Sequence, residues 1–142
     1  MKLIFLPDIS FFKSKKDSKF IKNFQSFLKR INRLFPNSNL VSNLECVLLK
    51  KKIKNKSKNF RKLHAENSFA KFLKNNQILN ICLANNHSFD FGEKGFEQMT
   101  KYLDKENINY FGGGKNLNYA RKPLILKSKE KSLAIFGLSY KP

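Results

Sequence analysis

Short apolar runs alternate along the chain with longer segments in which apolar residues recur every three or four positions. The runs Lys2–Leu6, Asn39–Ser42 and Ile78–Leu83 have the length and the β-branched or aliphatic content of buried strands. The three- and four-residue spacing predicts an amphipathic helix over residues 17–35 and a shorter helix over Asn67–Asn75. Strands that alternate with helices in this way favour parallel pairing with helical crossovers.

The last third of the chain continues this pattern and then departs from it. Apolar residues on one helical face predict a helix that begins at Gly92 and ends near Asn107, followed by a strand over Ile108–Phe111. The runs Pro123–Lys127 and Ser132–Phe136 flank a polar turn, which predicts a β-hairpin. The expected fold class is therefore an α/β sandwich of mostly parallel strands with helical crossovers and a C-terminal hairpin.

Polar residues follow three of the predicted strands at the point where each strand ends. Asp8 follows the first strand, Asn43 and Glu45 follow the second, and the loop from Asn85 to Asp90 follows the third. Because the carboxyl ends of parallel strands meet at one edge of a sheet, these side chains should converge there. Carboxylates, amide oxygens and an imidazole suit Mg²⁺, Mn²⁺, Zn²⁺ or Fe, and a bridging carboxylate could hold two ions. The pattern thus predicts a divalent-metal site.

Several of these residues also have simpler interpretations. Asp8 could cap a turn, and Asp90 could cap the helix that follows it. Ser88 is expected to donate a local hydrogen bond, and His64 is expected to be an exposed loop residue. Glu45 would be an ordinary surface acid if no metal site forms.

The charge of the chain allows two interpretations of its partners. The 142 residues carry a formal net charge of +19, which suggests nucleic acid, an anionic membrane surface or an acidic polymer. The excess is nearly all lysine, spread among many Asn, Ile and Phe residues, so a coding bias explains it equally well. Residues 50–59 form a lysine run without aromatic residues, which we predict to be a solvated, mobile basic loop and only a weak nucleic-acid signal.

Cysteine content and hydropathy place further bounds on the protein. Cys46 and Cys82 have neither a metal-ligand spacing nor a disulfide framework, so we expect reduced, buried thiols. No apolar run approaches the roughly 20 residues that span a bilayer, and the apolar start is too short for a signal peptide. The sequence as written indicates a cytoplasmic protein of a single domain.

Four segments of this chain together resemble the CapA-type capsule synthesis family. In order they are Asn43-Leu44-Glu45, Phe60-Arg61, the stretch from Leu83 through Asn85-Asn86-His87 and Asp90 to Gly92, and Gly112-Gly113-Gly114 with Asn116 and Ala120. The resemblance runs through nearly the whole chain, and Asn-Asn-His followed by Asp and Gly is its most specific part. That family is named for poly-γ-glutamate capsule production and looks like a branch of the calcineurin-like metallophosphoesterases. Its members are often associated with membranes.

The resemblance implies roles for individual residues. By analogy Asp8, Glu45 and Asn86 stand at metal-ligand positions, with Glu45 as the bridging carboxylate. His87 takes the place of the imidazole that contacts the leaving group or a phosphoryl oxygen. Asp90 would orient His87 and keep it protonated.

Further residues of the resemblance imply contacts with a substrate. Asn43, Asn85 and Arg61 would face an anionic, phosphate-containing substrate or polymer. Such a protein would use a divalent metal, Mn, Mg, Zn or Fe, in one or two sites.

Two departures from the family pattern limit what we expect of this chain. Pro7 stands where the family normally carries Gly before its first Asp. The histidine ligands of the superfamily come from a second half with a Gly-His-His motif, whereas this chain has only His64 and His87. We therefore expect residues 1–142 to form one partial domain that binds metal weakly and is inactive alone, possibly completed by a separate C-terminal half. The alternative is a non-catalytic basic fragment that binds nucleic acid or an anionic polymer.

Overall fold

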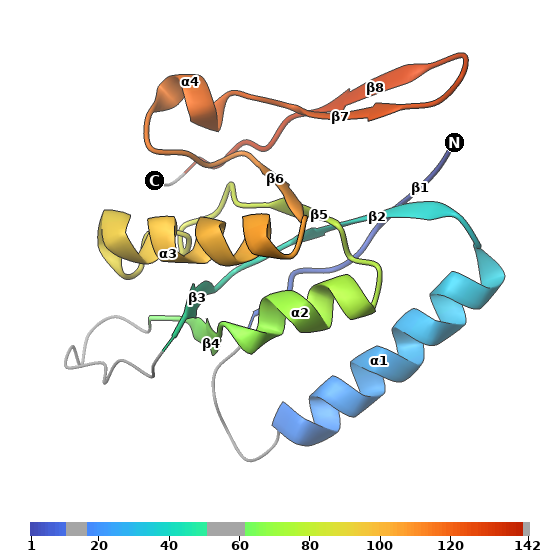
Figure 1. Cartoon of the computed structure of the whole chain (residues 1–142), viewed down its shortest axis with the longest axis horizontal. Coiled ribbons are helices and arrows are strands. Elements are labelled where there is room, and N and C mark those ends of the chain that lie inside the picture. Colours follow the sequence, from blue (N-terminus) through green and yellow to red (C-terminus); the bar gives the residue numbers. More distant parts are fainter. Residues whose placement is uncertain (11–16, 51–61, 141–142) are drawn as a thin grey trace.

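The main sheet of the protein is parallel and lies at the centre of the molecule. The computed structural model describes residues 1–10, 17–50 and 62–140 (Figure 1). The sheet has the order β1-β2-β5-β6, and its strands are β1 (Lys2–Phe5), β2 (Ser38–Asn43), β5 (Asn80–Cys82) and β6 (Asn109–Phe111). Each neighbouring pair is parallel. The expected α/β fold with parallel strands is thus confirmed, although β5 is shorter than predicted.

Helices connect the strands of this sheet in the order that the periodicity predicts. They are α1 (Asp17–Leu34), α2 (Ser68–Asn75) and α3 (Gly92–Lys105). After each helix one residue adopts a left-handed conformation, namely Asn37, Gln77 and Asn107, with φ between 57° and 63°. These residues reverse the chain, and a following amide bonds back to the helix in two cases, from Ile78 to Leu73 and from Ile108 to Leu103.

Alternating residues of the strands pack against two different layers. One face of the sheet, with Leu40 and Ile81, packs on α1, α2 and α3, whose core contacts include Leu28, Leu73 and Met99. The other face, with Val41 and Phe111, packs on a hairpin through Leu124 and Leu126. Figure 1 shows the resulting order of helices, sheet and hairpin. This two-residue alternation is the expected consequence of a strand buried on both faces.

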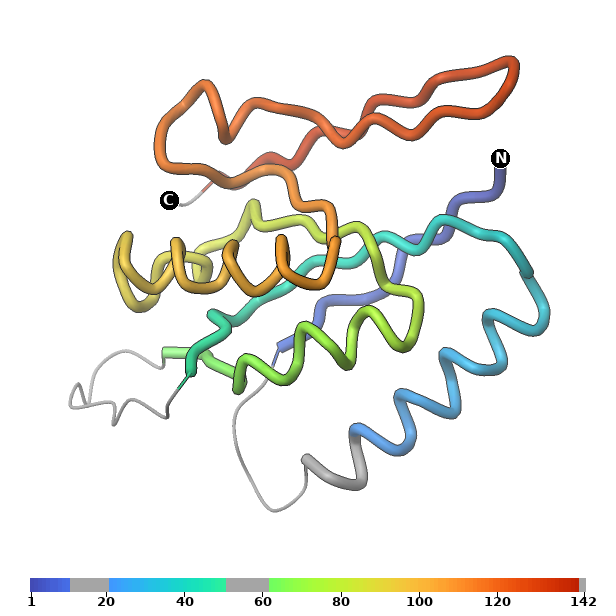
Figure 2. The backbone as a smooth tube through the Cα atoms, in the orientation of Figure 1, coloured from blue at the N-terminus to red at the C-terminus, as the bar shows by residue number. Residues whose placement is uncertain are grey.

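The hairpin and a short helix complete the described chain. Strands β7 (Leu124–Lys127) and β8 (Ser132–Ile135) pair antiparallel, which confirms the predicted hairpin. The helix α4 (Leu117–Ala120) follows the glycine turn at residues 112–114 and was not predicted. In Figure 2 the N-terminus lies on the right, on the same side as the turn of the hairpin, and the chain after β8 runs toward the left. No helix within the described residues is long and apolar enough to cross a membrane.

A second pair of parallel strands was not predicted. Strands β3 (Val47–Leu49) and β4 (His64–Glu66) pair beside α3. Segments of three residues are too short for a period to be recognised, and 14 residues separate the two strands. The expectation that His64 is an exposed loop residue is therefore wrong, because His64 belongs to β4, is partly buried and packs edge-on against Phe91. The predicted basic loop at 50–59 falls, apart from Lys50, outside the described residues.

Candidate functional site

The segments that leave β1, β2 and β5 stay side by side beyond the ends of the strands. The amide of Ile9 donates to the carbonyl of Asn43 at 2.8 Å, and the amide of Glu45 donates to the carbonyl of Ile9 at 2.8 Å. The amide of Leu44 donates to the carbonyl of Cys82 at 3.1 Å. This backbone ladder fixes the three segments to one another, so the side chains that follow the strands are presented together.

A chain of side-chain hydrogen bonds crosses these three strand ends. The Asn43 Nδ2 donates to Asp8 Oδ1 at 3.0 Å, and the Asn85 Nδ2 donates to Asn43 Oδ1 at 2.9 Å. Asp8 is exposed, whereas Asn43 and Asn85 are partly buried. The structure thus brings together one predicted metal ligand and two predicted substrate contacts, one from each of three strands. We call the set Asp8, Asn43, Glu45, Asn85, Asn86, His87 and Asp90 the carboxyl-edge site.

Asn85 is the centre of this network, and its amide is fully used inside the protein. Its Nδ2 also donates to the carbonyl of Leu44 at 3.0 Å. Its Oδ1 accepts the amide of His87 at 3.0 Å and the hydroxyl of Ser88 at 3.2 Å. Two donated and two accepted bonds match the capacity of a carboxamide. The geometry therefore suits Asn85 to holding the loop in place.

His87 and Asp90 form a pair within the same loop. The His87 Nδ1 lies 3.0 Å from Asp90 Oδ2, and this oxygen also accepts the amide of Leu63 at 2.6 Å. Because a carboxylate accepts but does not donate, we assign the proton to Nδ1, which leaves Nε2 for a ligand. Asp90 is not the cap of α3, because Phe91 occupies the N-cap position and no side chain bonds there.

Glu45 and Asn86 differ from their neighbours in the site because their side chains form no hydrogen bond with the described residues. Glu45 is partly buried and Asn86 is exposed. Among the described residues neither side chain has a hydrogen-bond partner. Their oxygens are therefore available to a ligand at the same end of the sheet as Asp8. The described residues contain no group of three or more His, Cys, Asp or Glu side chains that could hold a metal ion.

The supporting residues behave as the sequence predicts. Ser88 is buried and donates to the carbonyl of Leu83 at 2.7 Å, in addition to its bond to Asn85. Cys46 is buried and Cys82 is partly buried, and neither cysteine forms a disulfide. Burial raises the pKa of the Cys82 thiol, a hydrogen bond with the Ala84 backbone lowers it, and the charge of Asp8 raises it further. Cys82 is therefore a neutral thiol at pH 7.

A basic cluster beyond the glycine turn was missed by the sequence analysis. The Nζ atoms of Lys115 and Lys122 lie 4.9 Å and 4.6 Å from the centre of the Tyr119 ring. A signal for it exists, because residues 107–129 contain five Lys or Arg residues and no Asp or Glu. Arg61, the remaining predicted substrate contact, lies outside the described residues.

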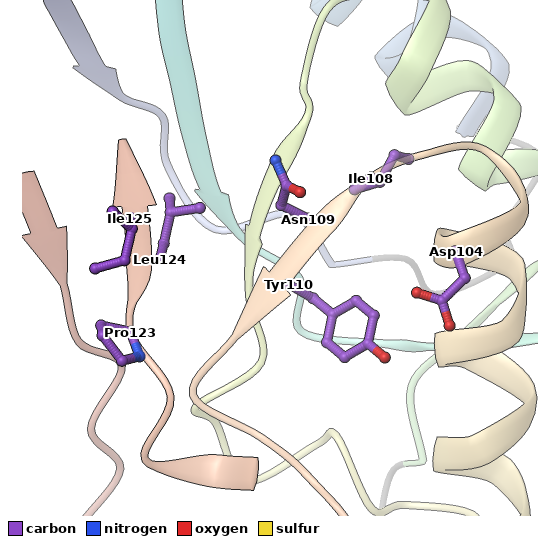
Figure 3. A pocket seen from close by; sticks show the side chains of 7 residues that line it. All are labelled: Asp104, Ile108, Asn109, Tyr110, Pro123, Leu124 and Ile125. Atoms are coloured by element: carbon purple, nitrogen blue, oxygen red, sulfur yellow. The ribbon is translucent and has the colours of Figure 1, made fainter. Parts of the chain in front are cut away.

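A pocket of about 400 Å³ lies elsewhere, between α3, the start of β6 and the hairpin (Figure 3). Its polar lining comes from Asp104, Asn109 and Tyr110, with apolar residues of β7 opposite them. Burial raises the pKa of the Tyr110 hydroxyl, and the charge of Asp104 adds to this effect. Asn109 is the first residue of β6, so the pocket is near the amino end of that strand and contains none of the predicted site residues.

Comparison with known proteins bears on the family of the chain. No curated protein matches the sequence. The family model of the bacterial capsule synthesis protein PGA_cap, however, matches residues 2–142, which is nearly the whole chain. This agrees with the resemblance carried by the Asn-Leu-Glu and Asn-Asn-His segments. The chain therefore belongs to the bacterial capsule synthesis protein family PGA_cap.

Proposed function

We propose that the carboxyl-edge site is the first part of a metallophosphatase-type site that acts on a phosphate-containing substrate in capsule synthesis. The observation that carries this proposal is the hydrogen-bonded chain from Asp8 through Asn43 to Asn85, with the His87–Asp90 pair in the same loop. Ligands typically bind at this edge of an α/β sheet. Here three strand ends share one polar network, and Nε2 of His87 has no bond within it.

The ligand atoms of this site are of the type that binds a divalent metal, but they are too few to complete its coordination shell. Asp8, Glu45 and Asn86 would hold the ion through hard oxygen donors, which suit Mg, Mn, Zn or Fe. Such an ion, when bound, stabilises negative charge on a phosphoryl oxygen. Since the described residues hold no cluster of three His, Cys, Asp or Glu, we propose that the remaining ligands come from outside residues 1–142, for example from a separate C-terminal half.

The other residues of the site would bind and orient the substrate. His87 would present Nε2 to a phosphoryl oxygen or leaving group, because Asp90 holds its Nδ1 at 3.0 Å. Asn43 has one Nδ2 proton left after its bond to Asp8 and could donate it to a phosphate oxygen. Asn85 would position His87 rather than touch the substrate, because its amide is fully bonded. Arg61 would supply a positive charge for the same substrate.

The alternative of a non-catalytic basic module for nucleic acid or an acidic polymer depends on net charge and on the lysine run. Residues 51–61, which hold most of that run, lie outside the described residues. The carboxyl-edge site has more specific support, because hydrogen bonds join Asp8, Asn43, Asn85, His87 and Asp90.

A metal titration tests the proposal. We expect Mn²⁺ to raise the free energy of unfolding by about 1.4 kcal/mol at a concentration ten times its Kd, and Asn86→Ala to abolish this gain. Unfolding in denaturant, with and without Mn²⁺, measures both values. Asn118→Ala, an exposed asparagine of α4, is the matched control and should keep the full stabilisation.

Equal stabilisation of the Asn86→Ala variant and the wild type would overturn the assignment of the metal site. Hydrolysis of a generic phosphodiester gives a second readout, and we expect little or none from this chain alone. Metal-dependent turnover by the 142-residue chain, lost in Asn86→Ala, would show that the site needs no further ligands.

A further inference from the structure

We infer that the pair of ammonium groups around Tyr119 is a second anion-binding subsite, and that the substrate of the carboxyl-edge site carries at least two phosphate groups. The subsite consists of Lys115, Tyr119 and Lys122, with Arg121 next to Lys122 in the chain. This inference deepens the proposed function and depends on it for the first phosphate. It assigns the class of substrate, a compound with a second phosphate group rather than a simple phosphomonoester.

The geometry of the subsite concentrates positive charge on one ring. Two Nζ atoms lie within 5 Å of the centre of the Tyr119 ring, at 4.9 Å and 4.6 Å. Contact with the ring face stabilises each ammonium and restricts its position. The residue Tyr119 is nevertheless 46% exposed, so the cluster faces solvent. Two restrained ammonium groups without an acid in the local sequence would bind a phosphate more readily than two freely moving lysines.

The chain around the subsite is tied to the carboxyl edge by close backbone packing. A Cβ atom on Gly112 would lie 2.8 Å from the Cβ of Ala84, the residue directly before Asn85. A Cβ on Gly114 would collide with the Cβ of Tyr119, so the turn also packs directly on α4. The glycine turn therefore holds the basic cluster near the loop that carries Asn85 and His87. Figure 1 shows α4 at the end of the sheet where that loop emerges.

The charge pattern of this surface suits an anionic ligand. Residues 107–129 contain Lys115, Arg121, Lys122, Lys127 and Lys129 and no acidic residue. In α3, by contrast, Glu93, Glu97 and Asp104 alternate with Lys94, Lys101 and Lys105. Lys74 also has an acidic partner within the protein, because its Nζ lies 3.4 Å from Glu106 Oε2. Among the described residues, no ion pair involves the cations of the 107–129 segment.

The test is an NMR titration of the ¹⁵N-labelled chain with tripolyphosphate in the presence of EDTA. We expect saturable shifts of the amides of residues 115–122, and a dissociation constant about tenfold weaker in Lys115→Gln/Lys122→Gln. The matched control, Lys22→Gln/Lys29→Gln, removes the same charge from two exposed positions of α1. It should change the constant less than twofold.

Two results would overturn the inference. One is an equal loss of affinity in both double variants, which would show that only net charge matters. The other is the absence of saturable shifts at residues 115–122 in the wild type. Because EDTA removes metal, the titration reports on the lysine cluster alone, whereas the Mn²⁺ experiment with Asn86→Ala reports on the carboxyl edge. Failure of the second subsite is thus distinguishable from failure of the proposed function.

Discussion

Asn85→Ala should lower the free energy of unfolding by about 3 kcal/mol, because one side chain joins four hydrogen bonds in the carboxyl-edge site. The substitution leaves the carbonyl of Leu44 and the amide of His87 without their partner. Leu44 is fully buried, so water cannot easily replace the lost bond. We expect the loop from Asn85 to Asp90 to lose its fixed conformation as well.

Asn86→Ala is the matched control for this prediction. It changes the next residue in the same way, but Asn86 is exposed and has no hydrogen-bond partner among the described residues. Its effect on the free energy of unfolding without metal should be within about 0.5 kcal/mol. Urea denaturation of the two variants and the wild type measures the difference. Similar effects of the two substitutions would contradict the distinction between a positioning Asn85 and a ligand-binding Asn86.

Gly112→Ala should be at least as damaging, with an expected loss of about 4 kcal/mol in the free energy of unfolding. Gly112 has a φ of +76°, which costs a side chain about 1–2 kcal/mol. The added Cβ would also lie 2.8 Å from the Cβ of Ala84 and 2.9 Å from the Cα of Gly137. Both contacts are far below normal separations, and one of them involves backbone, so the turn or the end of β5 must move.

Gly92→Ala separates the two causes of this effect. Gly92 has a similar φ of +65°, but a Cβ at this position meets nothing within 4 Å. Only the conformational cost remains, so we expect a loss of about 1 kcal/mol. Thermal or urea unfolding of both variants measures the pair. A loss for Gly112→Ala no greater than for Gly92→Ala would show that the turn is not packed against Ala84 as described.

The part of the fold that the sequence predicts is the part with clear periodicity. The 18 residues of α1 give several turns of apolar spacing, and β7 shows the two-residue alternation of a half-buried strand, so both were predicted close to their observed bounds. Strands β3 and β4 have three residues each and pair across a long connection. Their pairing is set by packing beside α3, which leaves no local pattern in the sequence.

The site was predictable in its location but not in its internal bonding. Asp8, Asn43 and Asn85 all follow strands, so parallel topology alone places them at one edge of the sheet. Adjacent asparagines look alike in a sequence, however, and nothing local distinguishes the partly buried, fully bonded Asn85 from the exposed Asn86. The Asp90 carboxylate also accepts a hydrogen bond from the amide of Leu63, which is 27 residues away in the sequence. Leu63 directly precedes β4, a strand that was not predicted. Such contacts depend on the assembled fold.

Paramagnetic broadening by Mn²⁺ tests most directly whether Asp8, Glu45 and Asn86 share one cation. In ¹H–¹⁵N NMR spectra of the chain, substoichiometric Mn²⁺ should selectively broaden the amides of Ile9, Glu45 and Asn86, even if binding is weak. The hairpin β7–β8 and the last turns of α1 should stay sharp, and Asp8→Asn should reduce the broadening. Broadening centred on the acidic residues of α3, or spread evenly over the chain, would contradict a common metal site at the carboxyl edge.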